Sequence, residues 1–180
     1  MKKLVYLISP NEIKKQFYDD LNRVLSYGNV KFFQLRLKKI KKNSLLRIAK
    51  KIRKITHKHK DKFIINDNYN LVSKTKADGC HMGQLDGSIK IARKKLKNKI
   101  LGITCHDSIE LAEMAVNCNA NYLAFGYFFK SKLKPRAKKA DPKILIKVKK
   151  KIKRPIVGIG GINNFNYKKI VKLGAKYIEI

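Results

Sequence analysis

The stretch Lys62–Asp86, with the sequence KFIINDNYNLVSKTKADGCHMGQLD, restricts the folds open to the whole chain more than any other. It contains two short apolar runs, Phe63–Ile65 and Cys80–Met82, and polar residues follow each of them at once. The segment between them, Tyr69–Lys76, has room for about two helical turns. A strand, a short helix and a second strand form a βαβ unit, in which the two strands lie parallel. The stretch therefore predicts a parallel α/β sheet.

Each of these two predicted strands is followed by a carboxylate, Asp67 after the first and Asp86 after the second. The C-terminal ends of parallel strands form the edge at which open α/β sheets and barrels place their chemistry. Two interpretations are open for the pair. The carboxylates form a metal site, or they cap helices, since Asp at the start of a helix satisfies free backbone N–H groups.

Strand and helix patterns alternate along the rest of the chain. Apolar runs predict eight strands, at Leu4–Ile8, Val30–Leu35, Phe63–Ile65, Cys80–Met82, Ile100–Thr104, Tyr122–Gly126, Pro155–Gly160 and Tyr177–Ile180. Helical spacing between them predicts seven helices, which start near Asn11, Asn43 or Ser44, Tyr69, Gly87-Ser88, Asp107 or Ser108, Pro142, and Asn163 or Asn164. Such alternation favours a closed (β/α)₈ TIM barrel, with an open doubly wound sheet as the alternative.

The length of 180 residues predicts one domain spanning residues 1–180, which is compact for a barrel of this class. The printed sequence stops at Ile180, before the helix that would cover the first and eighth strands. Exposed apolar surface there leads us to expect either self-association into a homo-oligomer or low stability as a monomer. No apolar run approaches the roughly 20 residues that a membrane span requires. Three cysteines without CxxC spacing are typical of a cytoplasmic protein without a disulfide framework.

The net charge of +32 comes from lysines spread over most of the chain, without a concentrated arginine stripe. A biased residue composition accounts for such a distribution, and no RNA-recognition, KH or zinc-finger pattern accompanies it. We therefore expect anionic small molecules to be attracted, with no specific recognition of nucleic acid.

The predicted strand ends bring a set of polar groups to one mouth of the barrel. They are Gln34, Arg36 and Lys38 after the second strand, Asn66 and Asp67 after the third, Gln84 and Asp86 after the fourth, Thr104 and His106 after the fifth, the segment Phe129–Pro135 after the sixth, and Gly160-Gly161 after the seventh. Carboxylates and phosphate oxygens suit Mg²⁺, cations take up phosphate charge, and glycines at a helix start cradle a second phosphate.

Four motifs carry a resemblance to a known family. QLRLK at residues 34–38, IIND at 64–67, DGCHMGQLD at 78–86 and GIGGI at 158–162 resemble thiamine phosphate synthases, in that family's order. The resemblance implies a TIM barrel that joins a pyrimidine diphosphate to a thiazole phosphate and releases pyrophosphate, with Mg²⁺ as cofactor and these phosphorylated small molecules as partners.

The resemblance also implies roles for individual residues. Asp67 and Asp86 would bind Mg²⁺. The substrates would be held by Gln34, Arg36, Lys38, Asn66, Thr104, Ser131, Lys134, Gly160 and Gly161, and catalysis would rest on Arg36, Thr104 and Lys134. The sequence departs from the family at Leu37, where a glutamate is usual, at Thr104, where serine is usual, and at Leu133, where threonine is usual.

Two other functions are consistent with these residues. A thiazole tautomerase would keep the barrel and the phosphate cradle and would depend on His106, but it would not need two metal carboxylates. A barrel without catalytic activity that binds polyanions is the second. His81 lies within a predicted strand, and we expect it to be a packed histidine with no catalytic role.

Overall fold

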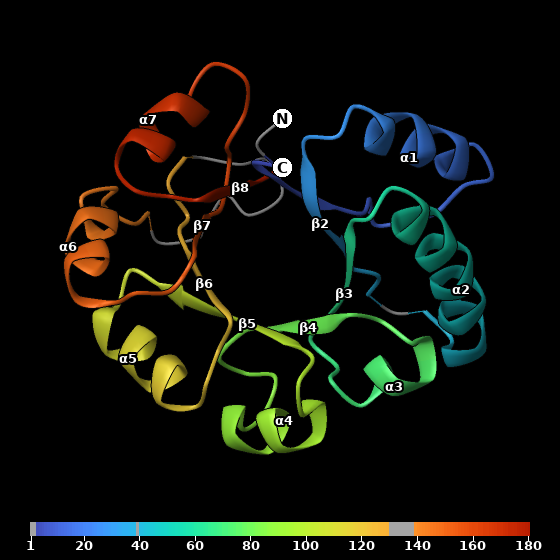
Figure 1. Cartoon of the computed structure of the whole chain (residues 1–180), viewed down its shortest axis with the longest axis horizontal. Coiled ribbons are helices and arrows are strands. Elements are labelled where there is room, and N and C mark those ends of the chain that lie inside the picture. Colours follow the sequence, from blue (N-terminus) through green and yellow to red (C-terminus); the bar gives the residue numbers. More distant parts are fainter. Residues whose placement is uncertain (1–2, 39, 130–138) are drawn as a thin grey trace.

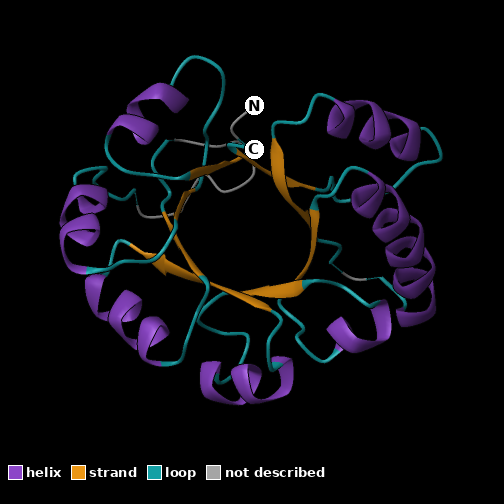
Figure 2. Cartoon of the chain, viewed as in Figure 1, coloured by secondary structure: helices purple, strands orange, loops and turns teal. Residues whose placement is uncertain are grey.

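The computed structural model describes residues 3–38, 40–129 and 139–180. Two of the predicted site residues, Ser131 and Lys134, lie outside these ranges. Within them, eight parallel strands pair in chain order and close into a barrel (Figure 2). Closure comes from the pairing of the first strand with the last, in which Val5 lies opposite Ile178 and Tyr6 opposite Glu179. The TIM-barrel prediction is confirmed, and the open-sheet alternative is wrong.

Helices alternate with the strands and surround them (Figure 1). The strands are β1 (Val5–Ile8), β2 (Val30–Leu35), β3 (Lys62–Asn66), β4 (Gly79–Met82), β5 (Ile100–His106), β6 (Tyr122–Phe125), β7 (Ile156–Gly158) and β8 (Tyr177–Glu179). The helices of the described residues are α1 (Phe17–Ser26), α2 (Lys42–Lys58), α3 (Leu71–Thr75), α4 (Ile89–Leu96), α5 (Ile109–Asn117), α6 (Ile144–Lys151) and α7 (Tyr167–Lys172).

Two predicted helix starts are wrong. Helix α1 begins at Phe17 and not near Asn11, because residues 11–12 form a bend and residues 15–16 form a turn. Helix α7 begins at Tyr167, since the side chain of Asn163 accepts a hydrogen bond from the Phe165 N–H at 2.9 Å and stabilises a turn instead. The start of α5 is confirmed, with the Ser108 hydroxyl accepting from the Leu111 N–H at 3.1 Å.

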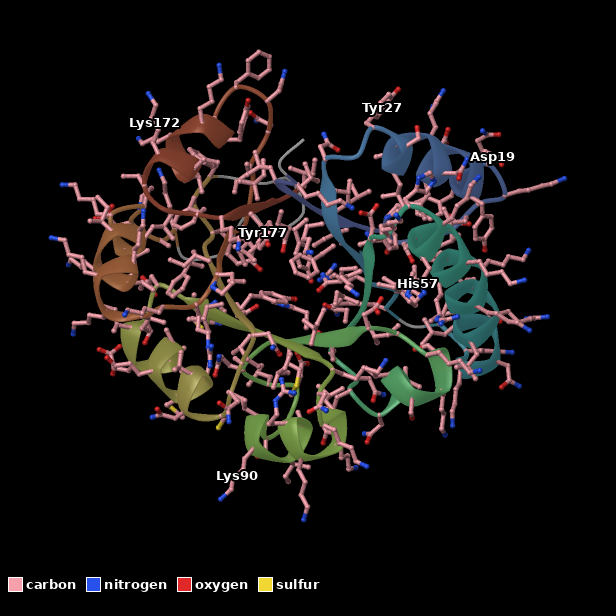
Figure 3. The ribbon with its side chains drawn as sticks, in the orientation of Figure 1. Asp19, Tyr27, His57, Lys90, Lys172 and Tyr177 are labelled. Atoms are coloured by element: carbon pink, nitrogen blue, oxygen red, sulfur yellow. The ribbon has the colours of Figure 1, made fainter. Side chains whose placement is uncertain are left out.

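The alternation of side chains along each strand divides the apolar residues between two cores. One core fills the barrel interior and contains Tyr6, Phe32, Ile64, Tyr122, Ala124, Val157, Ile159 and Tyr177. The larger core lies between the sheet and the helices, where Phe33, Phe63 and Leu123 are fully buried. Tyr177 points toward the interior in Figure 3, whereas Lys90 and Lys172 point outward from their helices.

The outward side of β1 is covered less than the other strands. Val5 and Leu7 are only half-buried there, in contrast to Phe33 on β2 and Leu123 on β6. This is the surface for which self-association is predicted, and that expectation stays a prediction. Among the described residues, no helix has both the length and the apolar composition needed to cross a membrane.

Candidate active site

Asp67 and Asp86 stand at the ends of neighbouring strands. Asp67 follows β3 directly, and its backbone N–H donates to the carbonyl of His81 on β4 at 2.7 Å. Its φ of +63° turns the chain sharply at this point. Asp86 lies in the turn after β4, where its carboxylate accepts a hydrogen bond from the Gly83 N–H at 2.6 Å. The two backbone arrangements hold both carboxyl groups at the C-terminal mouth of the barrel.

The carboxyl group of Asp86 lies close enough to Asp67 to raise the pKa of the Asp67 carboxyl group. Burial, the hydrogen bond with Asp86 and the charge of Asp86 raise the pKa of Asp67 to about 6, while the charges of Lys38 and Arg36 oppose the rise. Two carboxylates this close cannot both ionise easily unless a cation offsets their repulsion. In the absence of such a cation, Asp67 therefore keeps its proton up to about pH 6.

The helix-cap interpretation of these carboxylates is wrong. Helix α4 is capped by Ser88, whose hydroxyl accepts from the Ile91 N–H at 3.4 Å. Helix α3 begins after Asn70, which makes no side-chain cap hydrogen bond. Neither carboxylate accepts a hydrogen bond from the free N–H groups at the start of a helix. Helix capping therefore does not explain why both carboxylates lie at the mouth. Two carboxylates beside fixed cations are a suitable donor set for Mg²⁺ in the presence of a phosphate ligand.

A pocket of about 310 Å³ opens beside the carboxyl pair. Its walls are formed by the turn after β3 and by the turn after β4, through Asp67, Asn68, Tyr69, Asn70 and Asp86. This volume is at the lower end of the range for small-molecule sites. The pocket thus places room for a ligand directly against the two carboxylates.

The cations predicted from the end of β2 do come close to this pair. Arg36 and Lys38 both lower the pKa of Asp67 by their charge, which places them within electrostatic reach of its carboxyl group. The Arg36 N–H donates to the hydroxyl of Ser9 at 2.9 Å, which fixes the end of β2 against β1. Asn66, the last residue of β3, is half-buried and lies opposite His81 in the strand register.

Thr104 is hydrogen-bonded to two residues on or just after β4, the strand that leads to Asp86. The side-chain amide of Gln84 donates to the carbonyl of Thr104 at 2.5 Å, and His81 Nε2 lies 2.8 Å from the Thr104 hydroxyl. His106, at the exposed end of β5, has a φ of +53°. The buried His81 thus contacts a predicted site residue, Thr104.

Below the mouth, a chain of buried polar groups crosses the barrel interior, and sequence reasoning missed it. Gln34 contacts Tyr6, Tyr6 contacts Tyr122, and Tyr122 contacts His81. Burial raises the pKa of both tyrosines and lowers the pKa of His81 to about 4, so all three are neutral at pH 7. The prediction that His81 is a packed histidine is confirmed by its burial, although its ring also contacts Thr104.

Gly160 and Gly161 lie at the end of β7, across the barrel from β3 and β4 in the strand order. Both have positive φ angles, +86° and +67°. A Cβ on Gly160 would come within 2.4 Å of the Tyr127 ring, so only glycine fits there. The predicted phosphate cradle is therefore separated from the carboxyl pair by the width of the mouth. Within the described residues, no group of three or more His, Cys, Asp or Glu side chains gathers as a metal cluster.

Comparisons with known proteins agree with this geometry. The family model described as thiamine monophosphate synthase matches residues 5–180. The chain is 53% identical over 180 residues to a thiamine-phosphate synthase of Pelagibacter ubique, covering 99% of this chain and 87% of that protein. It is 36% identical to a thiamine-phosphate synthase of Erythrobacter litoralis, covering 98% and 85%.

A solved structure has the same arrangement. Thiamine phosphate pyrophosphorylase from Pyrococcus furiosus superposes with a TM-score of 0.88 at 27% identity, covering 99% of this chain and 85% of that one. The family match and this superposition both span nearly all of the chain. By its sequence and by its fold, the chain belongs to the thiamine monophosphate synthase family.

Proposed function

We propose that this chain is a transferase that joins a hydroxymethylpyrimidine diphosphate to a thiazole phosphate, forming thiamine phosphate and releasing pyrophosphate. The observation that carries the proposal is the carboxyl pair of Asp67 and Asp86, held beside a pocket and near the cations of β2. Membership of the family supports the choice of substrates. The proposed partners are thus small phosphorylated molecules.

The reaction breaks a C–O bond between the pyrimidine methylene group and the diphosphate. Negative charge grows on the leaving group while the aminopyrimidine stabilises the positive charge. We propose that Arg36 and Lys38 bind the departing diphosphate, and the proposal is supported by their electrostatic effect on Asp67 at the mouth. Fixed cations that meet developing negative charge lower the barrier without reorganising during the step. Lys134, outside the described residues, is proposed to serve the same leaving group.

We propose that Asp67 and Asp86 hold Mg²⁺. Bound there, Mg²⁺ would supply charge neutralisation to the diphosphate. The raised pKa of Asp67 supports this assignment, because burial and the neighbouring Asp86 disfavour its charged form, and a divalent cation would stabilise that form. A carboxyl pair of this kind has no task in a thiazole tautomerase, so the tautomerase alternative is not favoured.

The second substrate is proposed to bind at the opposite side of the mouth. Gly160 and Gly161 have positive φ angles, the backbone conformation in which successive N–H groups form a phosphate cradle, and they follow β7, on the other side of the barrel from β3. No covalent intermediate with the protein is required. The main tasks of the chain are to orient the two rings within attack distance and to neutralise the leaving group.

The proposal is tested by supplying both substrates with Mg²⁺ to the purified chain. The expected result is thiamine phosphate at a rate that depends on Mg²⁺ and on the thiazole phosphate. Release of a rearranged thiazole without coupling would favour the tautomerase instead. We also propose a cytoplasmic location, which the three free cysteines, Cys80, Cys105 and Cys118, support.

A further inference from the structure

Four hydrogen bonds link Gln34 on β2 to Thr104 on β5 through the barrel interior. The distances are 3.1 Å from the Tyr6 hydroxyl to Gln34 Oε1, 2.7 Å between the Tyr6 and Tyr122 hydroxyls, 3.0 Å from Tyr122 to His81 Nδ1, and 2.8 Å from His81 Nε2 to the Thr104 hydroxyl. The first four residues are buried, with exposed fractions of 7% or less, whereas Thr104 is half-buried at the mouth. The chain therefore ends at a group that a ligand can reach.

The packing around this chain leaves little freedom in its geometry. The Tyr122 ring stacks on the His81 ring with an interplanar angle of 12° and centroids 5.6 Å apart. The Tyr122 ring passes over Gly102 on β5, where an added Cβ would lie 1.9 Å from the Tyr122 ring. Gly102 thus allows Tyr122 to reach both Tyr6 and His81 at once, and the rings are held in place by contacts on several sides.

The direction of each hydrogen bond follows from the acceptor at the far end. Gln34 Oε1 can only accept, so the single hydroxyl proton of Tyr6 is donated to it. Tyr122 must then donate its proton to the Tyr6 oxygen, which leaves the Tyr122 oxygen as an acceptor for His81 Nδ1–H. A neutral imidazole carries one N–H, so Nε2 accepts, and Thr104 donates its proton to it.

We propose that Tyr6, Tyr122 and His81 are positioning residues for the Thr104 hydroxyl. The Gln34 amide oxygen sets the direction of their hydrogen bonds, so that the Thr104 oxygen acts as a hydrogen-bond acceptor toward the mouth. Thr104 has one proton, and the chain engages it inside the barrel. What remains on the open side is oxygen lone pairs. The group of the bound substrate that meets Thr104 is therefore an N–H or O–H donor and not a phosphate oxygen.

This inference rests on the proposed function only for the identity of the reaction. Cooperative polarisation along a buried chain makes the Thr104 oxygen a better acceptor than an isolated hydroxyl. A donor on the substrate that becomes more acidic as positive charge develops gains from such an acceptor in the transition state. The reverse orientation of the Gln34 amide would reverse every bond, giving an Nε2–H histidine and a Thr104 that donates.

The tautomer of His81 decides between the two directions, and it can be read without substrate. The protein is labelled with ¹⁵N-histidine, and the His81 ring resonances are assigned against the other three histidines, His57, His59 and His106. Two-bond couplings to the ring protons then identify the protonated nitrogen. We expect the Nδ1–H tautomer in the wild-type chain. An Nε2–H tautomer, or a doubly protonated ring at pH 7, overturns the proposal.

The variant Tyr6→Phe removes the link between Gln34 and Tyr122 while keeping the ring. Its matched control is Tyr177→Phe, because Tyr177 lies in the same interior core but outside the chain from Gln34 to Thr104. In Tyr6→Phe, Tyr122 becomes free to donate to His81, and we expect an Nε2–H signal to appear. In Tyr177→Phe we expect the wild-type tautomer. Unchanged spectra in both variants overturn the proposal.

Turnover supplies the second readout. We expect kcat of Tyr6→Phe to fall about tenfold, the effect of one weakened oriented hydrogen bond, with KM for the diphosphate nearly unchanged. Equal losses in Tyr6→Phe and Tyr177→Phe would mean a general packing effect and would overturn the proposal. If the wild-type protein forms no thiamine phosphate, the proposed function fails. The spectrum of His81 still decides the direction of the hydrogen bonds between Gln34 and Thr104.

Discussion

Asp67 lies beside Asp86 across the neighbouring ends of β3 and β4, close enough for Asp86 to raise the pKa of the Asp67 carboxyl group. Neither carboxylate caps a helix, since the start of α4 is capped by Ser88. Their proximity results from the parallel register, in which Asn66 lies opposite His81, and from the turn in which Gly83 donates to Asp86. A pair of carboxylates kept together at this edge, without a task in capping, is available to bind a cation.

Replacement of Asp86 by Asn should reduce turnover much more than stability. Asn keeps the acceptor for the Gly83 N–H but removes the charge needed for Mg²⁺. We expect a fall of about a hundredfold or more in kcat/KM, since such a metal supplies several kcal/mol of transition-state stabilisation. The melting temperature without metal should change little. Asp107→Asn, at an exposed position after β5, is the control and should keep its rate. Equal losses of rate and stability in Asp86→Asn would instead indicate a structural role.

The raised pKa of Asp67 predicts two opposite pH effects. Its pKa in the folded chain, about 6, lies above the ordinary value of 3.8, so the fold favours the protonated carboxyl. Without metal, this contribution to stability is complete below pH 3.8 and is lost as the pH rises through about 6. Mg²⁺ requires the deprotonated form, so the rise in melting temperature caused by Mg²⁺ should disappear as the pH falls through about 6.

Thermal melts from about pH 4.5 to about pH 8, with and without Mg²⁺, measure both effects over the window in which Asp67 titrates. In Asp86→Asn the Mg²⁺-dependent rise should be absent throughout. A rise of equal size at both ends of the window would show that the ion binds elsewhere.

Gly160→Ala should destabilise the chain more than Gly28→Ala. Both glycines have positive φ, +86° and +74°, so both variants carry the backbone cost of about 1–2 kcal/mol. A Cβ on Gly28 meets nothing within 4 Å, whereas a Cβ on Gly160 overlaps Tyr127. The difference between the two in chemical denaturation isolates the steric part. Gly160→Ala alone should also weaken binding of thiazole phosphate in calorimetry, and unchanged binding would remove residue 160 from the site.

The ion pair between Lys3 and Asp61 should stabilise the fold far more than the pair between Arg23 and Asp20. The Asp61 side chain is fully buried, and one of its oxygens, Oδ2, has no hydrogen-bond partner in the described structure. Lys3→Ala leaves this charge uncompensated and should cost about 3–5 kcal/mol of unfolding free energy. Arg23→Ala breaks an exposed pair and should cost less than about 1 kcal/mol. Urea denaturation compares them, and similar costs would contradict the prediction.

Much of the fold could be predicted because short apolar runs alternate with helical spacing along the chain. Periodicity along the sequence locates all eight strands, and the parallel direction that βαβ units impose is enough to place Arg36, Asp67 and Asp86 at one mouth. The start of α1 could not be located in this way, because Asn11, a residue type that often caps helices, lies in a bend before the helix. Local signals predict where a helix can start, and packing decides where it does.

The interior chain from Gln34 to Thr104 shows a different limit. Alternation along β1 and β6 marks Tyr6 and Tyr122 as inward-facing, but it does not say which inward side chains meet across the barrel. Their contact depends on the space left at Gly102, on a third strand. A relationship among three strands is not contained in the pattern of any one of them, and so the sequence predicts only that His81 is packed.

The most direct test of the account measures both products in one reaction. The chain is incubated with the pyrimidine diphosphate, the thiazole phosphate and Mg²⁺, and thiamine phosphate and pyrophosphate are quantified over the same time course. We predict that the two form in equal amounts, and that formation stops on chelation of Mg²⁺ and in the double variant Asp67→Asn with Asp86→Asn. Pyrophosphate without thiamine phosphate, or product formation at the wild-type rate in the double variant, would contradict the account.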